Sequence, residues 1–338
     1  KILEEIRNWR SSNPGLLIEA VEIDIFGFSR GAAAARHFAN EVLKAEHGVL
    51  SGLLSPRTAG FAPNFSWNRV RLNFIGLFDT VAALVDPLEG DFSPANDRNP
   101  GLNLYLPPGC ARKVVHLTAR DEKRWNFALN SVAPGHLEIE LPGSHSDIGG
   151  GYPPLMTERL LIGKPRPVLL YWGRSPEQSK AWQEALTEAE QLELQGLPAG
   201  SLRISSRPLS ASHQRSTASS ERHLVLLEVN RQVRNELARV YLDAMHRIAA
   251  AHGVPLDPFD PADPKLVIPA DLELIAQKLL AIAHGASQQL SFMDERHLRA
   301  RYIHLSAHWT PIKGLLINKP APSGRLVYAN QPQKDYPA

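Results

Sequence analysis

The sequence predicts an α/β fold in which a mostly parallel sheet is covered by helices. Through the first half of the chain, apolar runs rich in β-branched residues alternate with segments of helix formers, the order that a parallel sheet requires. The run 70–78 ends in five uninterrupted apolar residues, a pattern typical of a strand buried on both faces. A Gly-x-Ser-x-Gly sequence at 27–31 stands between a strand-like run and a helix-like run, which places a sharp turn at the end of a strand.

Each element of the first half is predicted from its local pattern. The strand before the turn is apolar, with Val21, Ile23 and Ile25 in alternation, and the helix after it has strong helix formers and no breaker. Pro142-Gly143 ends the last strand. The expected order is helix 2–9, strand 16–26, helix 32–43, and strands 70–78, 114–117 and 137–141.

The second half is expected to be mainly helical. Ser175 followed by Pro176 is a helix start, and that helix is expected to end near Gly196. Further helices are expected at 224–251, 270–283 and 292–302. Residues 1–170 would then form an α/β catalytic core, and residues 171–338 a helical cap or extra lobe. The serine-rich stretch around 200–221 is expected to be a mobile linker.

The composition excludes several classes of protein. The 37 basic and 35 acidic residues provide no global field for nucleic acid. The single cysteine, Cys110, excludes an intrachain disulfide and a multi-cysteine metal site, and no cofactor is expected. His304 and His308 have the spacing of two metal ligands on a helix, but no third ligand is evident, so we expect a packed pair.

The chain shows no sign of a membrane span or an export signal. No apolar run approaches about 18 residues, so we expect any membrane contact to be peripheral. Residues 1–10 form a charged amphipathic stretch and not a signal peptide, which predicts synthesis in the cytoplasm.

Ser29 is the candidate nucleophile. Glycines on either side of it suit a sharp strand-to-helix turn that projects the hydroxyl out of the sheet edge. The start of the following helix adds positive potential, and the backbone N–H of Arg30 is expected to face a developing oxyanion. The alternative is a tight turn without chemistry.

A serine nucleophile needs a base and an acid that orients it. Asp79 follows the strand 70–78 and is the candidate acid; the alternative is a turn or helix-cap aspartate. His145 follows the strand 137–141 in a glycine-rich loop and is the candidate base. Asp147 competes with Asp79 for the acid role, but we expect it to brace the loop by bonding backbone N–H groups.

Taken in order, several blocks of the sequence resemble one α/β-hydrolase family, which includes the first group of bacterial type VI secretion lipase effectors. These blocks are Gly27-Phe28-Ser29-Arg30-Gly31-Ala32, Phe78-Asp79-Thr80-Val81, the run from His116 to Arg124, the run from Gly143 to Tyr152, and a late block from Arg301 to Ala307. The resemblance covers about the first half of the chain and this late piece.

The resemblance implies the roles of nucleophile, acid and base for Ser29, Asp79 and His145. It also implies phospholipase A activity on glycerophospholipids, with the A2 type ahead of the A1 type. The implied partners are a phospholipid membrane surface, a secretion spike component and a cognate immunity protein. Delivery would be by the type VI system into the periplasm of a rival cell.

The chain departs from the family at its start. The family usually begins with a strand that carries an Asp-Gly-containing loop well before the serine turn, whereas only one helix and one strand are predicted before Ser29. We therefore expect the first strands, and a loop that supplies the second oxyanion N–H, to be absent from this chain. It would then be a fragment or one of several pieces.

Two other functions remain open at this stage. The same machinery could act on a soluble ester or thioester, or the fold could be a non-catalytic binding or adaptor module. An apolar lid or acyl-chain rim within 86–108, around Leu102, Leu104 and Leu106, would favour a lipid substrate.

Overall fold

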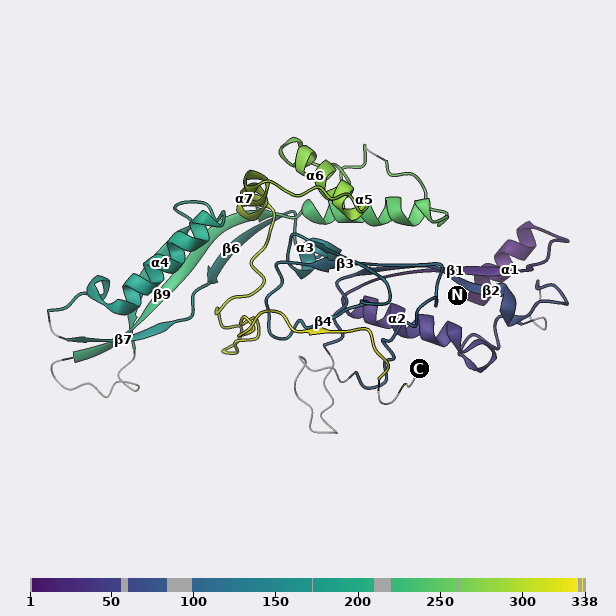
Figure 1. The fold of residues 1–338 in the computed structure, drawn as a ribbon, viewed down its shortest axis with the longest axis horizontal. Coiled ribbons are helices and arrows are strands. Elements are labelled where there is room, and N and C mark those ends of the chain that lie inside the picture. Colours follow the sequence, from purple (N-terminus) through teal and green to yellow (C-terminus); the bar gives the residue numbers. More distant parts are fainter. Residues whose placement is uncertain are drawn as a thin grey trace.

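A four-stranded parallel sheet forms the centre of the computed structural model, which describes residues 2–55, 60–83, 99–171, 173–209, 220–260, 262–333 and 336 (Figure 1). Its strand order is β1-β2-β3-β5, and each neighbouring pair is parallel. The strands are β1 (Val21–Phe28), β2 (Val70–Phe78), β3 (Lys113–Ala119) and β5 (Leu137–Leu141). The predicted α/β class is therefore confirmed, and the predicted bounds of β2 and β5 agree with the structure.

Helices cover both faces of this sheet. On β2, Phe74 belongs to one apolar cluster, while Ile75 and Leu77 belong to the other, because successive side chains of a strand point to opposite faces. Fully burying such a side chain contributes about 1.5–3 kcal/mol. The Phe74 face packs against α5 (Leu237–Ala251), α6 (Ala270–Ala283) and α7 (Phe292–Arg301), and the opposite face packs against α2 (Arg30–Leu43). The helix α1 (Ile2–Ser12) lies near the starts of β1 and β2 (Figure 1).

Residues 155–234 contribute an arm that projects away from the parallel sheet (Figure 1). Its long strand β9 pairs antiparallel with the other three strands, and α4 packs against it. The arm consists of β6 (Leu155–Leu161), β7 (Arg166–Tyr171), the 3-10 turn η4 (Pro176–Gln178), α4 (Lys180–Leu194), β8 (Leu202–Pro208) and β9 (Ser220–Arg234).

The arm consists mostly of strands, whereas the sequence predicted a mainly helical second half. The helix expected over 224–251 is a strand as far as Arg234 and a helix only from Leu237. Alternate residues of β9 from Val225 to Val233 are buried, so a period of two outweighs the helical stripe that the same apolar residues also match. Residues 202–208, expected in a mobile linker, form β8, because β9 offers it a pairing edge. The rest of that linker, 210–219, lies outside the described residues.

The C-terminal segment returns to the parallel sheet. Its strand β10 (Val327–Tyr328) pairs with β4 (Leu129–Asn130), and the Ala321 N–H donates to the Lys123 carbonyl oxygen at 2.8 Å. The short elements are η1 (Ala45–His47), η2 (Trp67–Arg69) and α3 (His145–Gly149). Among the described helices, none has the length and apolar character needed to span a bilayer.

Candidate active site

Ser29 lies on a sharp turn between β1 and α2. Its backbone has φ 57° and ψ −124°, and its N–H donates to the Phe78 carbonyl oxygen at 3.0 Å. A Cβ at Gly27 would lie 2.4 Å from the Gly31 carbonyl oxygen, so only glycine fits at 27. A Cβ at Gly31 would meet nothing within 4 Å, so the second glycine of the motif is not required by the turn.

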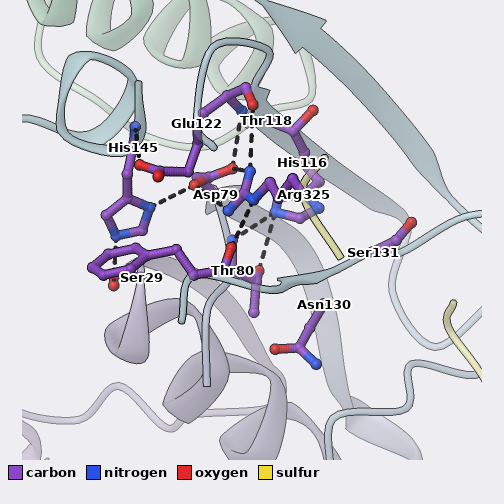
Figure 2. Close-up of polar contacts among 12 residues, drawn as sticks. Ser29, Asp79, Thr80, His116, Thr118, Glu122, Asn130, Ser131, His145 and Arg325 are labelled. Carbon is purple, nitrogen blue, oxygen red and sulfur yellow. Dashed lines mark hydrogen bonds and ion pairs between the residues drawn. The ribbon is translucent and has the colours of Figure 1, made fainter. Parts of the chain in front are cut away.

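The structure brings Ser29, His145 and Asp79 together at the carboxyl ends of the parallel strands. His145 is the first residue of α3, after β5, and Asp79 follows β2 directly. The distance from His145 Nε2 to Ser29 Oγ is 2.7 Å, and that from His145 Nδ1 to Asp79 Oδ2 is 2.5 Å (Figure 2). Both ring nitrogens are therefore within hydrogen-bonding reach, as an imidazole relay requires.

Asp79 is fully buried and saturated with donors. The Ala119 N–H donates to Oδ1 at 2.9 Å, and Arg325 Nη1 and Nη2 donate to Oδ1 and Oδ2 at 2.8 Å each. Burial by itself would raise the pKa of the Asp79 carboxyl, but the Arg325 charge and the hydrogen bonds from His145 and Arg325 outweigh it, and this pKa lies below its usual range. The carboxylate is thus held in its charged form.

The imidazole of His145 lies between two aromatic rings. The ring centroids of Phe28 and Phe127 lie 4.6 and 4.9 Å from that of His145, which is only 4% exposed. The Arg124 guanidinium lies 3.2 Å from the centroid of the Phe127 ring. These contacts hold the ring in place and shield its bond to Asp79 from water.

Glu122 braces the backbone beneath His145. Its Oε2 accepts the His145 N–H at 3.3 Å, and its carboxylate accepts three bonds from Arg124 and one from Ser306. Residues 121–124 form no helix, and Glu122 is only 1% exposed. The buried Glu122 charge is balanced by Arg124 and not by water.

Asp147 lies within α3 and contacts neither Ser29 nor Asp79 in the recorded hydrogen bonds. Its Oδ2 accepts the Ser144 and His304 backbone N–H groups at 2.9 and 3.0 Å, and its Oδ1 lies 2.7 Å from His304 Nδ1. Burial raises the pKa of Asp147. His304 stacks on Tyr152 with centroids 3.6 Å apart, and it lies in coil beyond α7, so His304 and His308 share no helical face.

The other candidate residues lie at the mouth of the site. Arg30 is exposed at the start of α2, where Ala32 and Ala33 already donate to the Ser29 carbonyl oxygen, so the Arg30 N–H precedes the first closed turn. A pocket of about 450 Å³ opens beside Ser29. It is lined by Phe28, Ser29, Arg30, Gly31, Arg124, Phe127, His145 and Ser146. Within the described residues, no group of three metal-ligating side chains is present.

The apolar rim expected within 86–108 is only partly described. Residues 84–98 lie outside the described residues. Leu104 and Leu106 are buried, and Leu104 packs with Ala33 of α2 and Ala82. In the part that the structure describes, this segment is a packed connection and not a lipid-facing rim.

Sequence reasoning missed three contributors to the site. Arg325 lies 246 positions after Asp79 in a coil, where no periodicity or motif marks a lone arginine. Phe127 belongs to no motif. Glu122 lies within a block of family resemblance, but nothing in that block indicated its buried role.

Comparisons with known proteins show similarity to type VI secretion effectors. A family model described as "T6SS, Phospholipase effector Tle1-like, catalytic domain" matches residues 53–165, a range that contains Asp79 and His145 and begins after Ser29. A solved structure described as the Tle1 effector bound to the VgrG spike from the Type 6 secretion system is similar to this chain, with a TM-score of 0.80 and 28% identity. That alignment covers 97% of this chain and 71% of the other.

A second solved structure is more distant. It is described as an uncharacterized protein from Pseudomonas aeruginosa, with a TM-score of 0.41, 21% identity, and coverage of 88% of this chain and 33% of that chain. No curated protein matches the sequence. The family resemblance that the sequence blocks indicated is confirmed by the family model and by the first structure.

Proposed function

Because a Tle1-like phospholipase effector model and a solved Tle1 effector both match this chain, we propose that it is a serine phospholipase A that uses Ser29, His145 and Asp79. The single observation that supports this most strongly is the unbroken set of contacts from Ser29 Oγ through His145 to Asp79. Three side chains from three separate strand ends meet in the order and geometry of a nucleophile, a base and an orienting acid.

The proposed reaction runs through an acyl-enzyme. His145 Nε2 takes the proton from Ser29 Oγ as the oxygen attacks the ester carbonyl carbon, and Asp79 stabilises the imidazolium. The backbone N–H of Arg30 donates to the oxyanion, aided by the start of α2. Collapse breaks the ester bond as His145 gives its proton to the departing lysophospholipid oxygen. Water then attacks the acyl-serine by the same route and releases the fatty acid.

We further propose the setting of this activity. The related effector is described as bound to the VgrG spike, which supports a spike component as a partner of this chain. The proposal also includes synthesis in the cytoplasm, delivery into the periplasm of a rival cell, action at the phospholipid surface and neutralisation by a cognate immunity protein. The A2 type is favoured over the A1 type.

The test is hydrolysis of a defined phospholipid whose two acyl chains differ, presented in vesicles. We expect the wild type to release one of the two fatty acids, and the identity of that acid distinguishes A2 from A1. Ser29→Ala should lower the rate of fatty acid release by at least about 10³-fold, because the covalent step is lost. Its thermal unfolding midpoint should be unchanged. Unchanged release of fatty acid by Ser29→Ala would refute the proposal. Equal turnover of short soluble esters without vesicle binding would point to a soluble substrate.

A further inference from the structure

The carboxylate partner of His145 has an unusual second partner. Arg325 approaches Asp79 with two nitrogens, each 2.8 Å from a different carboxylate oxygen, and both side chains are almost entirely buried (Figure 2). Such a two-pronged contact fixes the plane of the carboxylate as well as neutralising its charge. One oxygen of Asp79 therefore bonds both Arg325 and His145, and the other bonds Arg325 and a backbone N–H.

Arg325 is itself held so that it cannot turn toward a substrate. Its Nε donates to the Phe127 carbonyl oxygen at 2.7 Å, and its Nη1 also reaches the Ala119 carbonyl oxygen at 3.3 Å. Phe127 is the residue whose ring packs on His145. The guanidinium thus joins three parts of the site: the acid, the strand that supports it, and the aromatic wall of the base.

We propose that Arg325 is a positioning residue of this active site, which keeps the buried Asp79 carboxylate charged and presents one of its oxygens to His145. This inference rests on the proposed function. Without a cation, a carboxylate in a water-free site takes up a proton more readily than one in water, and a neutral carboxyl stabilises an imidazolium poorly. The Arg325 charge offsets the cost of keeping the buried Asp79 carboxylate ionised. A contact with substrate would not explain the position of Arg325.

The other described charged groups around the site do not neutralise Asp79, because they pair with one another. The other charged or titratable groups near Asp79 and His145 are bonded to one another: Glu122 to Arg124, Asp147 to His304, and His116 to Glu138. From α5, the Tyr241 hydroxyl donates to the Pro142 carbonyl oxygen. Arg30 is exposed at the pocket mouth. Among the residues that the structure describes, Arg325 is thus the cation recorded in contact with Asp79.

The proposal predicts the direction of a pH effect. In Arg325→Gln, Asp79 loses its cation and takes up a proton at a higher pH than in the wild type. Where Asp79 stays charged, its charge acts on His145 alone, and the imidazole holds its proton to a higher pH. Both effects move the acid limb of activity in the same direction, upward by about 1–3 pH units.

The experiment measures the rate at which a fluorophosphonate labels Ser29 as a function of pH. In this reaction Ser29 Oγ bonds to phosphorus, fluoride leaves and His145 takes the hydroxyl proton, so no lipid is needed. We expect Arg325→Gln to shift the acid limb of the labelling rate to higher pH. Arg325→Lys keeps the positive charge but loses the two-nitrogen contact with Asp79, so we expect it to keep the wild-type acid limb and to label at a lower rate. Arg231→Gln is the matched control, because Arg231 also forms a buried ion pair, with Glu158, and touches neither Asp79 nor His145.

Each outcome decides one point. A wild type that labels nowhere in the pH range would refute the proposed function, whereas normal labelling with superimposable acid limbs in wild type and Arg325→Gln would refute the role of Arg325 alone. If Arg325→Gln does not fold, Arg325→Lys decides: labelling at the wild-type rate at every pH would overturn the positioning role. An equal shift in Arg231→Gln would show that any lost buried ion pair has the same effect, and would also overturn it.

Discussion

Two residues of the candidate triad have backbone conformations that few side chains adopt. Ser29 has φ 57° and Asp79 has φ 42°, and each such position costs about 1–3 kcal/mol. In both, the N–H donates to a carbonyl oxygen of the neighbouring strand, Ser29 to Phe78 of β2 and Asp79 to Leu117 of β3. The sheet therefore continues one residue past each strand and offsets the strain, so the register of the parallel sheet positions both side chains.

The two motif glycines provide a residue-scale prediction. Gly27→Ala should destabilise the protein by at least about 1–3 kcal/mol, because its Cβ would meet backbone atoms of Gly31 and Ala32 that no side-chain rotation can move. Gly31→Ala should instead raise the unfolding free energy by about 0.4–1 kcal/mol, because its Cβ has open space in a helical turn. Denaturant unfolding of both variants is the measurement. Equal destabilisation by the two substitutions would contradict this account of the turn.

At the scale of elements, the sequence was most informative where a segment has one strong pattern. The strands β2 and β5 and the helix α6 were predicted with their observed bounds, because apolar runs and helix formers there had no competing period. Residues 224–234 were misassigned, since their apolar residues fit both a helical stripe and a strand alternation, and only pairing with the distant β6 and β8 decides between them. Arg325 could not be predicted, because its role depends entirely on where the C-terminal coil returns.

The short helix α3 provides an element-scale prediction. Ser144 and Asp147 form a capping box at the end that carries His145, and all recorded contacts of the Asp147 carboxylate are with donors or a ring nitrogen. Asp147→Asn places an amide N–H₂ against those donors and should lower the free energy of unfolding by about 1–3 kcal/mol. It should also slow Ser29 labelling, because α3 then holds His145 less firmly.

The chain contains a matched control for this substitution. Ser291 and Asp294 form the same capping box at the start of α7, where the half-buried Asp294 also pairs with Lys278. Asp294→Asn should cost about 1 kcal/mol of stability and leave Ser29 labelling unchanged. Thermal unfolding and labelling are measured for both variants. If Asp294→Asn slowed labelling as much as Asp147→Asn, the effect would be one of general stability and not of α3.

At the scale of the whole molecule, the site is assembled from both ends of the described chain. Ser29 comes from the first strand, and Arg325 comes from a segment that passes beside β4 and holds further buried groups. Asn330 Oδ1 accepts from Arg36 Nη2 at 3.2 Å and from the Leu106 N–H at 3.0 Å. The described members of the two large apolar clusters on the sheet end at Ile303, so this segment contributes to the site without forming its core.

This separation of core and site predicts the effect of truncation. A chain that ends at Asn318 retains every described residue of both large apolar clusters, so it should unfold cooperatively. It lacks Arg325, so the acid limb of Ser29 labelling should shift upward by about 1–3 pH units, as in Arg325→Gln. A chain that ends at Asn330 keeps Arg325, β10 and the Asn330 bonds to Arg36 and Leu106, and should label at the wild-type rate. Labelling rates and unfolding curves of the two truncated chains are compared with the full chain. If the acid limb of the chain ending at Asn318 matched that of the full chain, the C-terminal segment would be dispensable for the geometry of Asp79 and His145, and the site would have to be regarded as complete within the sheet and its two helical layers.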